Sequence, residues 1–240
     1  TNDASGTGIG SIDSAGSVST TAGFSIISWT GSGSAATIAH GLGLKLNMYI
    51  VKNRSDSGED WIVYHGANTS APETDYIMLN EANATGDSSG VWNDTAPTSS
   101  VFSVGTANST NGSSKNMIAY CFADVKGYSK FGGYSGNGNA NGTFVYTGFK
   151  PAFVMVKITN AGNDWIIMDN KRTPFNPMGE ELKPNTNGAS STNTRWDQLS
   201  NGFKFRDTGD AVNGSGKNYI YMAFAEEPFV ASNFNAATAR

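Results

Sequence analysis

The sequence predicts an all-β protein built from antiparallel β-sandwiches, made of two homologous internal repeats of about 105 residues. Two observations carry this prediction. First, short apolar runs of strand length are separated by turns rich in Gly, Asn and Pro, and no twelve-residue window free of Gly and Pro has a 3.6-residue apolar period. Second, a thirteen-residue stretch occurs twice, as Asn111–Ala123 and Asn213–Ala225, with eight of thirteen positions identical.

Each copy of this stretch reads as a turn followed by a strand. The Asn-Gly pair supplies backbone that tolerates positive φ, and an aromatic and aliphatic run follows it. Alternate residues of the run are apolar on both faces, as Ile220 and Tyr221 show. We therefore predict that each copy is a central strand, covered on both sides, and not an edge strand.

The duplication extends beyond the repeated stretch. The matching pairs are Lys52 with Lys157, Trp61 with Trp165, Leu79 with Leu182, and Trp92 with Trp196, at offsets of 103 to 105 residues, against 102 for the repeated stretch. A steady offset with small slips is typical of two copies of one unit that have since gained and lost loop residues.

Taken in order, the chain is predicted to have four parts. Residues 1–22 are poor in apolar residues and rich in Gly, Ser and Thr, which predicts a flexible arm or linker. Residues 23–133 form the first repeat, 134–142 a joint loop, and 143–240 the second repeat with a C-terminal tail. The expected strands of the first repeat are Phe24 to Trp29, Ala35 to Ala39, Met48 to Lys52, Trp61 to His65, Tyr76 to Leu79, Val101 to Val104, Met117 to Phe122 and Tyr128 to Phe131. Those of the second are Phe144 to Tyr146, Phe153 to Ile158, Trp165 to Met168, Phe203 to Arg206 and Tyr219 to Ala225.

Composition excludes several functions. The formal net charge is −4 and no basic cluster exists, so binding to nucleic acid is not expected. No run of eighteen apolar residues occurs, so no membrane span is expected. The chain opens at Thr1 without a signal peptide, which suggests a fragment or a processed product. Only 15% of residues are charged, and hydroxyls and amides provide much of the polarity, as in many secreted and virion-surface β proteins.

Few residues suit metal binding or catalysis. Cys121 is the only cysteine, which excludes intrachain disulfides and thiolate metal sites and suggests a buried thiol. His40 and His65 are the only histidines, and Asp169 replaces His65 in the second repeat, so both are interpreted as structural. We predict no metal, no cofactor and no catalytic residue.

A glycosidase would need two carboxyl groups about 5–10 Å apart across a cleft. The adjacent pairs Glu180-Glu181 and Glu226-Glu227 cannot supply them from a strand, because neighbouring residues point to opposite faces. The chain is therefore predicted not to be an enzyme.

The five tryptophans raise the question of carbohydrate binding, because sugars stack on exposed indole rings. Trp61 and Trp165 lie in strands with apolar alternation and are assigned to the core, together with Ile118, Phe122, Ile220 and Phe224. Trp92 and Trp196 have polar neighbours and are the better candidates for an exposed platform. The predicted residues of a surface-glycan site are Trp92, Asn93, Asp94, Tyr134 and Trp196.

An ordered set of motifs outside the N-terminal arm resembles a known family. The motifs are Gly23-Phe-Ser-Ile26, His40-Gly-Leu-Gly43, Ile50-Val-Lys-Asn-Arg54, Trp61-Ile-Val-Tyr-His65, Trp92-Asn-Asp-Thr95, Pro97-Thr-Ser-Ser-Val-Phe102, Gly127-Tyr-Ser-Lys-Phe131, Gly136-Asn-Gly138, Tyr146-Thr-Gly-Phe149, Tyr221-Met-Ala-Phe-Ala-Glu226 and Pro228-Phe229. They are similar to an uncharacterised domain near the C-termini of tail-fibre and other structural proteins of tailed, often marine, bacteriophages. That family has no assigned catalytic residues. The resemblance implies a location in the virion, within an oligomeric appendage.

Three hypotheses follow from these observations. The first is a non-enzymatic virion protein, the end of a tail fibre or spike, that serves host-surface adhesion or assembly. The second is a glycan-cleaving tail depolymerase, and the third is an architectural decoration protein of the capsid or tail. The expected partners are further copies of the chain, with a homotrimer favoured, other virion proteins and a host-surface glycan.

Overall fold

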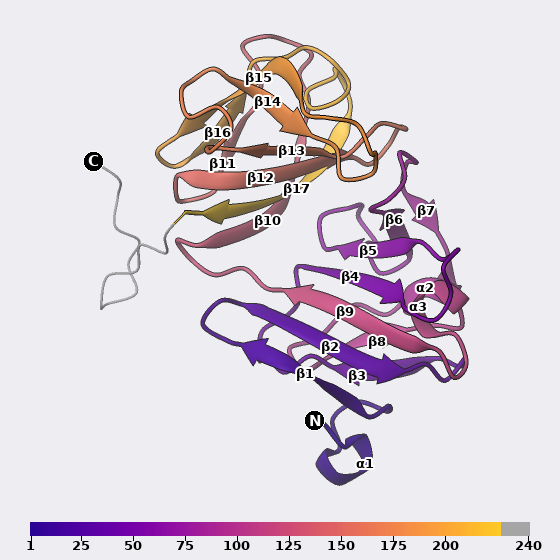
Figure 1. Cartoon of the computed structure of the whole chain (residues 1–240). Coiled ribbons are helices and arrows are strands. Elements are labelled where there is room, and N and C mark those ends of the chain that lie inside the picture. Colours follow the sequence, from indigo (N-terminus) through magenta and orange to yellow (C-terminus); the bar gives the residue numbers. More distant parts are fainter. Residues whose placement is uncertain (227–240) are drawn as a thin grey trace. The chain divides into compact units, whose positions relative to one another are not determined.

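A computed structural model describes residues 1–226, which form two compact units (Figure 1). Unit 1 comprises Thr1–Leu79 and Thr85–Ala123, and unit 2 comprises Asn80–Ala84 and the described residues from Asp124 to Glu226. Strands make up 42% and helices 5% of the described residues, and neighbouring strands in the sheets run antiparallel. The predicted all-β, antiparallel class is therefore confirmed. No helix in residues 1–226 is long and apolar enough to span a membrane.

Unit 1 is a β-sandwich with one large and one small sheet. The seven strands of the large sheet are, in spatial order, β1 (Ser14–Ser19), β2 (Phe24–Thr30), β9 (Asn116–Phe122), β4 (Met48–Asn53), β5 (Trp61–His65), β6 (Asp75–Met78) and β7 (Gly86–Asp87). The small sheet pairs β3 (Ala36–Ala39) with β8 (Val101–Val104), and the one-turn helices are α1 (Ala4–Thr7), α2 (Ser89–Trp92) and α3 (Asn108–Asn111). Trp29 and Tyr49 of the large sheet contact Phe102 of β8, with ring centroids 5.6 and 4.9 Å apart. The apolar core of unit 1 lies between the two sheets.

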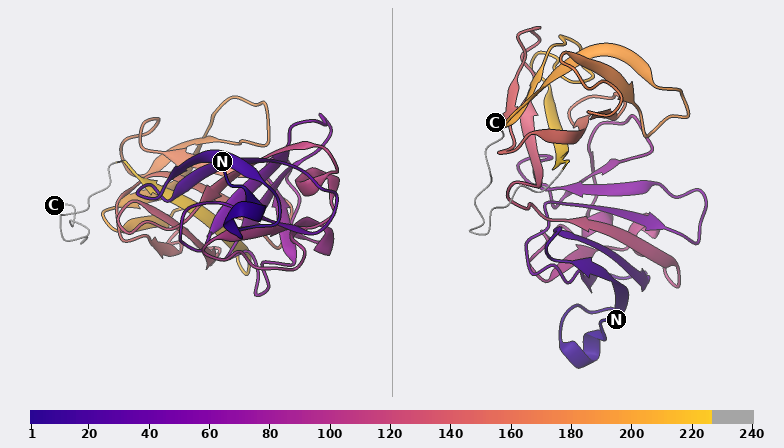
Figure 2. Two further views of the ribbon diagram at one scale, coloured as in Figure 1. Left: turned by 90° about the horizontal axis from the view of Figure 1, so that it is seen from below. Right: turned by 60° about the vertical axis from the view of Figure 1, so that its left-hand side comes forward.

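Unit 2 is one sheet that curls over its own core. Its eight strands are, in spatial order, β10 (Ser129–Ser135), β17 (Asn218–Ala225), β12 (Pro151–Ile158), β13 (Ile166–Asp169), β14 (Met178–Leu182), β15 (Ser191–Leu199), β16 (Gly202–Phe205) and β11 (Phe144–Tyr146). Tyr134 of β10 stacks on Phe205 of β16 with ring centroids 4.9 Å apart, and Tyr221 of β17 meets Phe203 of β16 at 5.5 Å. Strands near opposite ends of the sheet order therefore pack against each other. Figure 2 gives two further views of the ribbon.

The repeated thirteen-residue stretch forms a central strand in each unit, as predicted. β9 lies between β2 and β4, and β17 lies between β10 and β12. The turn before each strand differs from the expectation, because the positive φ falls on Ser114 (60°) and Gly216 (68°), three residues after the Asn.

The Asn of the repeated turn is instead a buried hydrogen-bond donor and acceptor. The Asn111 amide nitrogen donates to Ser34 O at 2.7 Å and Gly105 O at 3.0 Å. The Asn213 amide nitrogen donates to Asn139 O at 3.0 Å and Asp207 O at 2.8 Å. In both units this side chain joins separate loops beside the central strand.

Residues 1–22 are not only an arm. Ser14–Ser19 form strand β1, whose six residues pair with β2 at the edge of the large sheet. Ile12 packs against the core of unit 1. The low apolar content reflects the position of β1 at a sheet edge, where most side chains face solvent.

The boundary between the two units also differs from the predicted one. The sequence placed residues up to 133 in the first repeat and expected a joint loop at 134–142. In the structure, β10 pairs along its whole length with β17, so unit 2 begins at Asp124 and also includes Asn80–Ala84. The final part of the predicted tail, residues 227–240 with Pro228 and Phe229, lies outside the described residues.

Two of the six residues assigned to the core are fully buried, and four are not. Trp165 and Ile220 of unit 2 are buried, as expected. The other four residues assigned to the core are half-buried: Trp61, Ile118, Phe122 and Phe224. The apolar alternation identified these strands correctly, but it did not show which side chains are fully covered.

Candidate functional site

Neither tryptophan of the predicted glycan site is exposed. Trp92 closes helix α2 with its ring in the core of unit 1, and its indole N–H donates to Asp75 O at 3.0 Å. Trp196 of β15 is 1% exposed and meets Phe203 edge-on, with ring centroids 5.7 Å apart. The prediction that these rings form a platform for a sugar is therefore wrong.

The remaining predicted residues do not form a site with the tryptophans. Asn93 and Asp94 are exposed and adopt left-handed backbone conformations, which end helix α2. The ring of Tyr134 stacks on Phe205 and on Tyr219, with centroids 4.9 and 4.8 Å apart. Its hydroxyl donates to Val212 O at 2.7 Å, and burial raises the pKa of this phenol well above its usual value. Tyr134 thus supports the core of unit 2.

Both histidines are held by their own turns. The Nδ1 atom of His40 accepts from the Leu42 N–H at 3.3 Å, and that of His65 accepts from the Ala67 N–H at 3.1 Å. Burial lowers the pKa of His40. Within residues 1–226, no group of three or more His, Cys, Asp or Glu side chains is placed to hold a metal ion.

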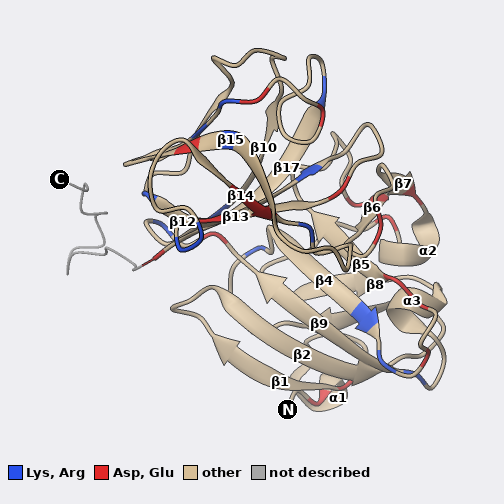
Figure 3. Ribbon diagram, turned by 45° about the horizontal axis from the view of Figure 1, so that its top comes forward, with Lys and Arg blue, Asp and Glu red and all other residues tan. Residues whose placement is uncertain are grey.

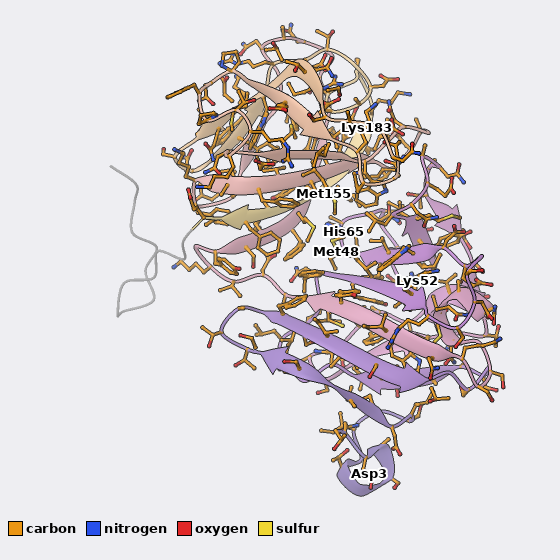
Figure 4. All side chains as sticks on the ribbon, viewed as in Figure 1. Asp3, Met48, Lys52, His65, Met155 and Lys183 are labelled. Atoms are coloured by element: carbon orange, nitrogen blue, oxygen red, sulfur yellow. The ribbon has the colours of Figure 1, made fainter. Side chains whose placement is uncertain are left out.

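A pocket that the sequence did not predict lies on the outer face of the large sheet of unit 1. It has a volume of about 380 Å³ and is lined by Lys52, Asn53, Arg54, Asp56, Ser57, Trp61, Ile118 and Tyr120. Strand pairing brings these residues together from three strands, because Lys52 of β4 lies opposite Trp61 of β5 on one side and Ile118 of β9 on the other. Lys52 lies near the end of β4. This part of β4 is blue in Figure 3, and the Lys52 side chain is labelled in Figure 4.

Two aromatic rings form the wall of this pocket, which we call the Trp61 pocket. The rings of Trp61 and Tyr120 are stacked at an angle of 27°, with centroids 6.2 Å apart. Both side chains are half-buried, and both line the pocket. An apolar ring surface with a polar edge suits a ligand that has both apolar and hydroxyl faces.

The loop after β4 forms the polar rim of the pocket. Asn53 is fully buried, and its side-chain oxygen Oδ1 accepts from the backbone N–H groups of Ser55 at 2.9 Å and Asp56 at 3.1 Å. Its amide nitrogen donates to Asp56 at 3.0 Å and to Asn108 O at 2.9 Å. These bonds hold the loop in one conformation before any ligand arrives.

The charge of Asp56 is already satisfied. Lys115 donates to one carboxylate oxygen at 2.8 Å, and Asn108 and Asn53 donate to the other, each at 3.0 Å. Lys115 and Asn108 are the main causes of its lowered pKa. A carboxylate that stays ionised and fully bonded is poorly suited to act as a general acid.

The two basic side chains of the pocket are less constrained. The Lys52 ammonium donates to the carbonyl oxygen of Glu59. Arg54 is exposed, and its guanidinium makes no hydrogen bond or ion pair with any residue in 1–226. The pocket therefore offers a stacking surface beside cationic donors that can turn toward a ligand.

In unit 2, the residues that correspond in sequence to Lys52, Ile118 and Trp61 are buried. Lys157 pairs with Ile220 across β12 and β17, as Lys52 pairs with Ile118 across β4 and β9, but Lys157, Ile220 and Trp165 are each buried. The carbonyl oxygen of Ala82 accepts from the Lys157 ammonium at 3.4 Å and from Asn163 N–H at 2.8 Å. Burial lowers the pKa of Lys157 to about 8. Ala82 of the segment Asn80–Ala84 thus contacts Lys157 within unit 2.

Sequence reasoning missed Trp61 because its strand alternates like a core strand. One signal was available, since the six residues Arg54–Glu59 before it are polar or glycine. A loop of that composition indicates that the start of β5 lies near solvent, but it does not indicate that the ring lines a pocket.

The comparisons with known proteins give a family without a function. No curated protein and no solved structure matches the chain. One family, described as a domain of unknown function (DUF7483), matches residues 1–228. Because the match covers both units, the chain belongs to the DUF7483 family.

Proposed function

We propose that this protein is a non-enzymatic adhesion domain that binds surface saccharides through the Trp61 pocket. The observation that carries the proposal is the stacked pair of Trp61 and Tyr120, which lines a pocket beside a polar rim. Pyranose rings have apolar faces that stack on aromatic rings, and their hydroxyl groups match the amide and ammonium groups at the rim. The bonded state of Asp56 favours binding over cleavage.

A binding experiment with matched variants tests this function. The purified chain is applied to a glycan array beside Trp61→Ala, Tyr120→Ala and Tyr146→Ala variants. Tyr146 is 65% exposed on β11 of unit 2 and serves as a control for the loss of an exposed aromatic ring. We expect the first two substitutions to abolish glycan binding and the third to leave it unchanged. Equal binding by all four proteins contradicts the assignment of the pocket.

The same samples distinguish adhesion from hydrolysis. Bound polysaccharide is incubated with the protein and assayed for new reducing ends. We expect none, because the proposed site has no free acid–base pair of carboxyl groups. Release of reducing ends would replace the adhesion proposal with a depolymerase. Absence of both binding and cleavage would favour the architectural role.

The proposed setting is the end of a tail fibre or spike in a bacteriophage virion. Its support is the ordered set of motifs from Gly23 to Phe229 and the low charge of the chain. Weak saccharide sites gain avidity when several copies act together, which favours a homotrimer. Light scattering on the chain, extended to the full length of its gene product, tests this state. A monomer would contradict the trimer.

The two units are further proposed to be copies of one ancestral fold. In support, the order β2-β9-β4-β5-β6 in unit 1 parallels β10-β17-β12-β13-β14 in unit 2. The strands β3 and β8 pair with each other, as do β11 and β16. An experimental structure tests the proposal by superposition of the units, which should place Lys52 on Lys157 and Trp61 on Trp165. Any other correspondence contradicts the duplication.

A further inference from the structure

The Trp61 pocket is one end of a longer groove. A second pocket, of about 430 Å³, is lined by Thr1, Asn2, Asp3, Asp13, Ser14, Ala15, Ser28, Trp29, Thr30, Arg54, Asn116 and Met117. Arg54 lines both pockets, so they adjoin at its side chain. The ligand surface therefore continues beyond the aromatic pair, towards the edge of the sheet.

The strand register explains how the groove is built. Trp61, Lys52, Ile118, Ser28 and Ala15 lie opposite one another on β5, β4, β9, β2 and β1. Neighbouring strands are about 4.8 Å apart, so this row of five strands is roughly 19 Å wide. Such a width fits a chain of several sugars that crosses the strands, whereas a single sugar would fill only the Trp61 end.

The charges along the groove differ between its ends. At the edge of the sheet, Asp3 accepts from the Gly6 N–H at 2.9 Å and Asp13 accepts from the Ala4 N–H at 2.9 Å. Two acidic side chains at this end disfavour an anion. In the middle, Arg54 has no acidic partner within residues 1–226, and the carboxylate of Asp56 is already paired with Lys115. The groove thus favours one anionic group beside Arg54 and uncharged groups towards β1.

We infer that the natural ligand is a linear heteropolysaccharide in which acidic sugars are separated by neutral ones. One sugar stacks on Trp61 and Tyr120, a carboxylate of the chain meets the Arg54 guanidinium, and neutral sugars lie over Ser28 and Ala15. The planar guanidinium fork matches the two oxygens of a carboxylate. This inference rests on the proposed saccharide function and specifies the class of saccharide.

Calorimetric titration with three defined probes tests it. The probes are an alternating uronate–N-acetylhexosamine hexasaccharide, its carboxyl-reduced neutral form, and the corresponding acidic disaccharide. At 50 mM salt we expect the acidic hexasaccharide to bind about fivefold more tightly than the neutral form, as one partly exposed ion pair provides. The disaccharide should bind more weakly than the hexasaccharide, because it cannot reach across the groove. The preference for the acidic form should shrink at 500 mM salt.

Variants separate this inference from the proposed function. Arg54→Gln should remove the preference for the acidic hexasaccharide and leave binding of the neutral form unchanged. Lys126→Gln makes the same charge change at an exposed position of unit 2 and should alter neither. Equal affinity for the acidic and neutral forms, or a preference that survives in Arg54→Gln, overturns the inference but leaves saccharide binding intact. Loss of all binding in Trp61→Ala but not in Arg54→Gln supports the function, whereas no binding by the unaltered chain overturns both the function and the inference.

Discussion

At the scale of single residues, Lys157 links the stability of unit 2 to pH. Burial lowers its pKa to about 8, whereas a lysine in an unfolded chain has a pKa of about 10.4. Between these values the unfolded state binds more protons than the folded state, so stability rises with pH in that window. Below about pH 8 the full cost of burying the ammonium is present.

The Lys157→Met variant isolates this effect. We expect the free energy of unfolding of the unaltered protein, relative to Lys157→Met, to increase by on the order of 2 kcal/mol from pH 7 to pH 10. Urea unfolding of both proteins at several pH values measures the difference, and groups common to both cancel. A difference that does not change with pH would show that Lys157 titrates as an exposed lysine.

Trp92 is predicted to stabilise the fold without touching a ligand. Trp92→Phe leaves the Asp75 carbonyl without its indole donor and opens space in the core of unit 1. We expect a loss of about 1–3 kcal/mol in the free energy of unfolding and no change in saccharide binding. Urea unfolding and calorimetric titration check the two parts. Weaker saccharide binding by a folded Trp92→Phe protein would show that Trp92 contributes to the binding site.

The tryptophans show what the sequence can and cannot indicate about single side chains. Polar residues next to them in the sequence placed Trp92 and Trp196 in the predicted site. Adjacent side chains point in other directions, however, so they do not indicate whether the indole ring is exposed. Apolar alternation placed Trp61 in the core. Alternation shows which residues share a face of the sheet, but it does not show whether other residues bury that face. In unit 2 the Lys157 ammonium donates to the Ala82 carbonyl oxygen, and no local pattern predicts this contact with a segment so distant in sequence.

At the scale of elements, the edge strand β1 depends on a glycine. A Cβ atom at Gly16 would fall on the Ile26 carbonyl oxygen of β2, whereas a Cβ at Gly58 would meet no atom within 4 Å. We expect Gly16→Ala to speed hydrogen exchange of the β1 amides, because the strand must separate from β2. Gly58→Ala should leave exchange in β1 unchanged. Equal protection in both variants would mean that β1 accommodates the methyl group by a small shift.

The repeated stretch was the element most open to prediction. Two apolar faces identified β9 and β17 as central strands, because a strand with solvent on one face would alternate with polar residues. The role of the buried Asn111 and Asn213 was not predictable. Their hydrogen bonds join loops that are distant in sequence, whereas an Asn-Gly pair indicates only a local turn. The edge strand β1 was missed because it contains almost no apolar residues.

At the scale of the whole molecule, the two units have separate cores. Phe102 belongs to the core of unit 1 and Phe203 to that of unit 2, and both are fully buried. We expect each residue's replacement by Ala to cost about 3–5 kcal/mol and to lower the melting temperature of its own unit only. Calorimetry of the unaltered protein should then show two transitions, one of which moves in each variant. A single transition that moves in both variants would show that the units unfold together.

The position of β9 and β17 has a consequence for the order in which the protein can form during synthesis. Each is the last main-sheet strand of its unit to leave the ribosome, and each must enter between two strands made much earlier. Until Asn218–Ala225 is translated, β10 and β12 have no central neighbour and present open edges to other chains. Premature termination just before residue 218 would therefore remove a central strand of the sheet and not an edge strand. Such a product should aggregate, even though it retains about nine-tenths of the chain.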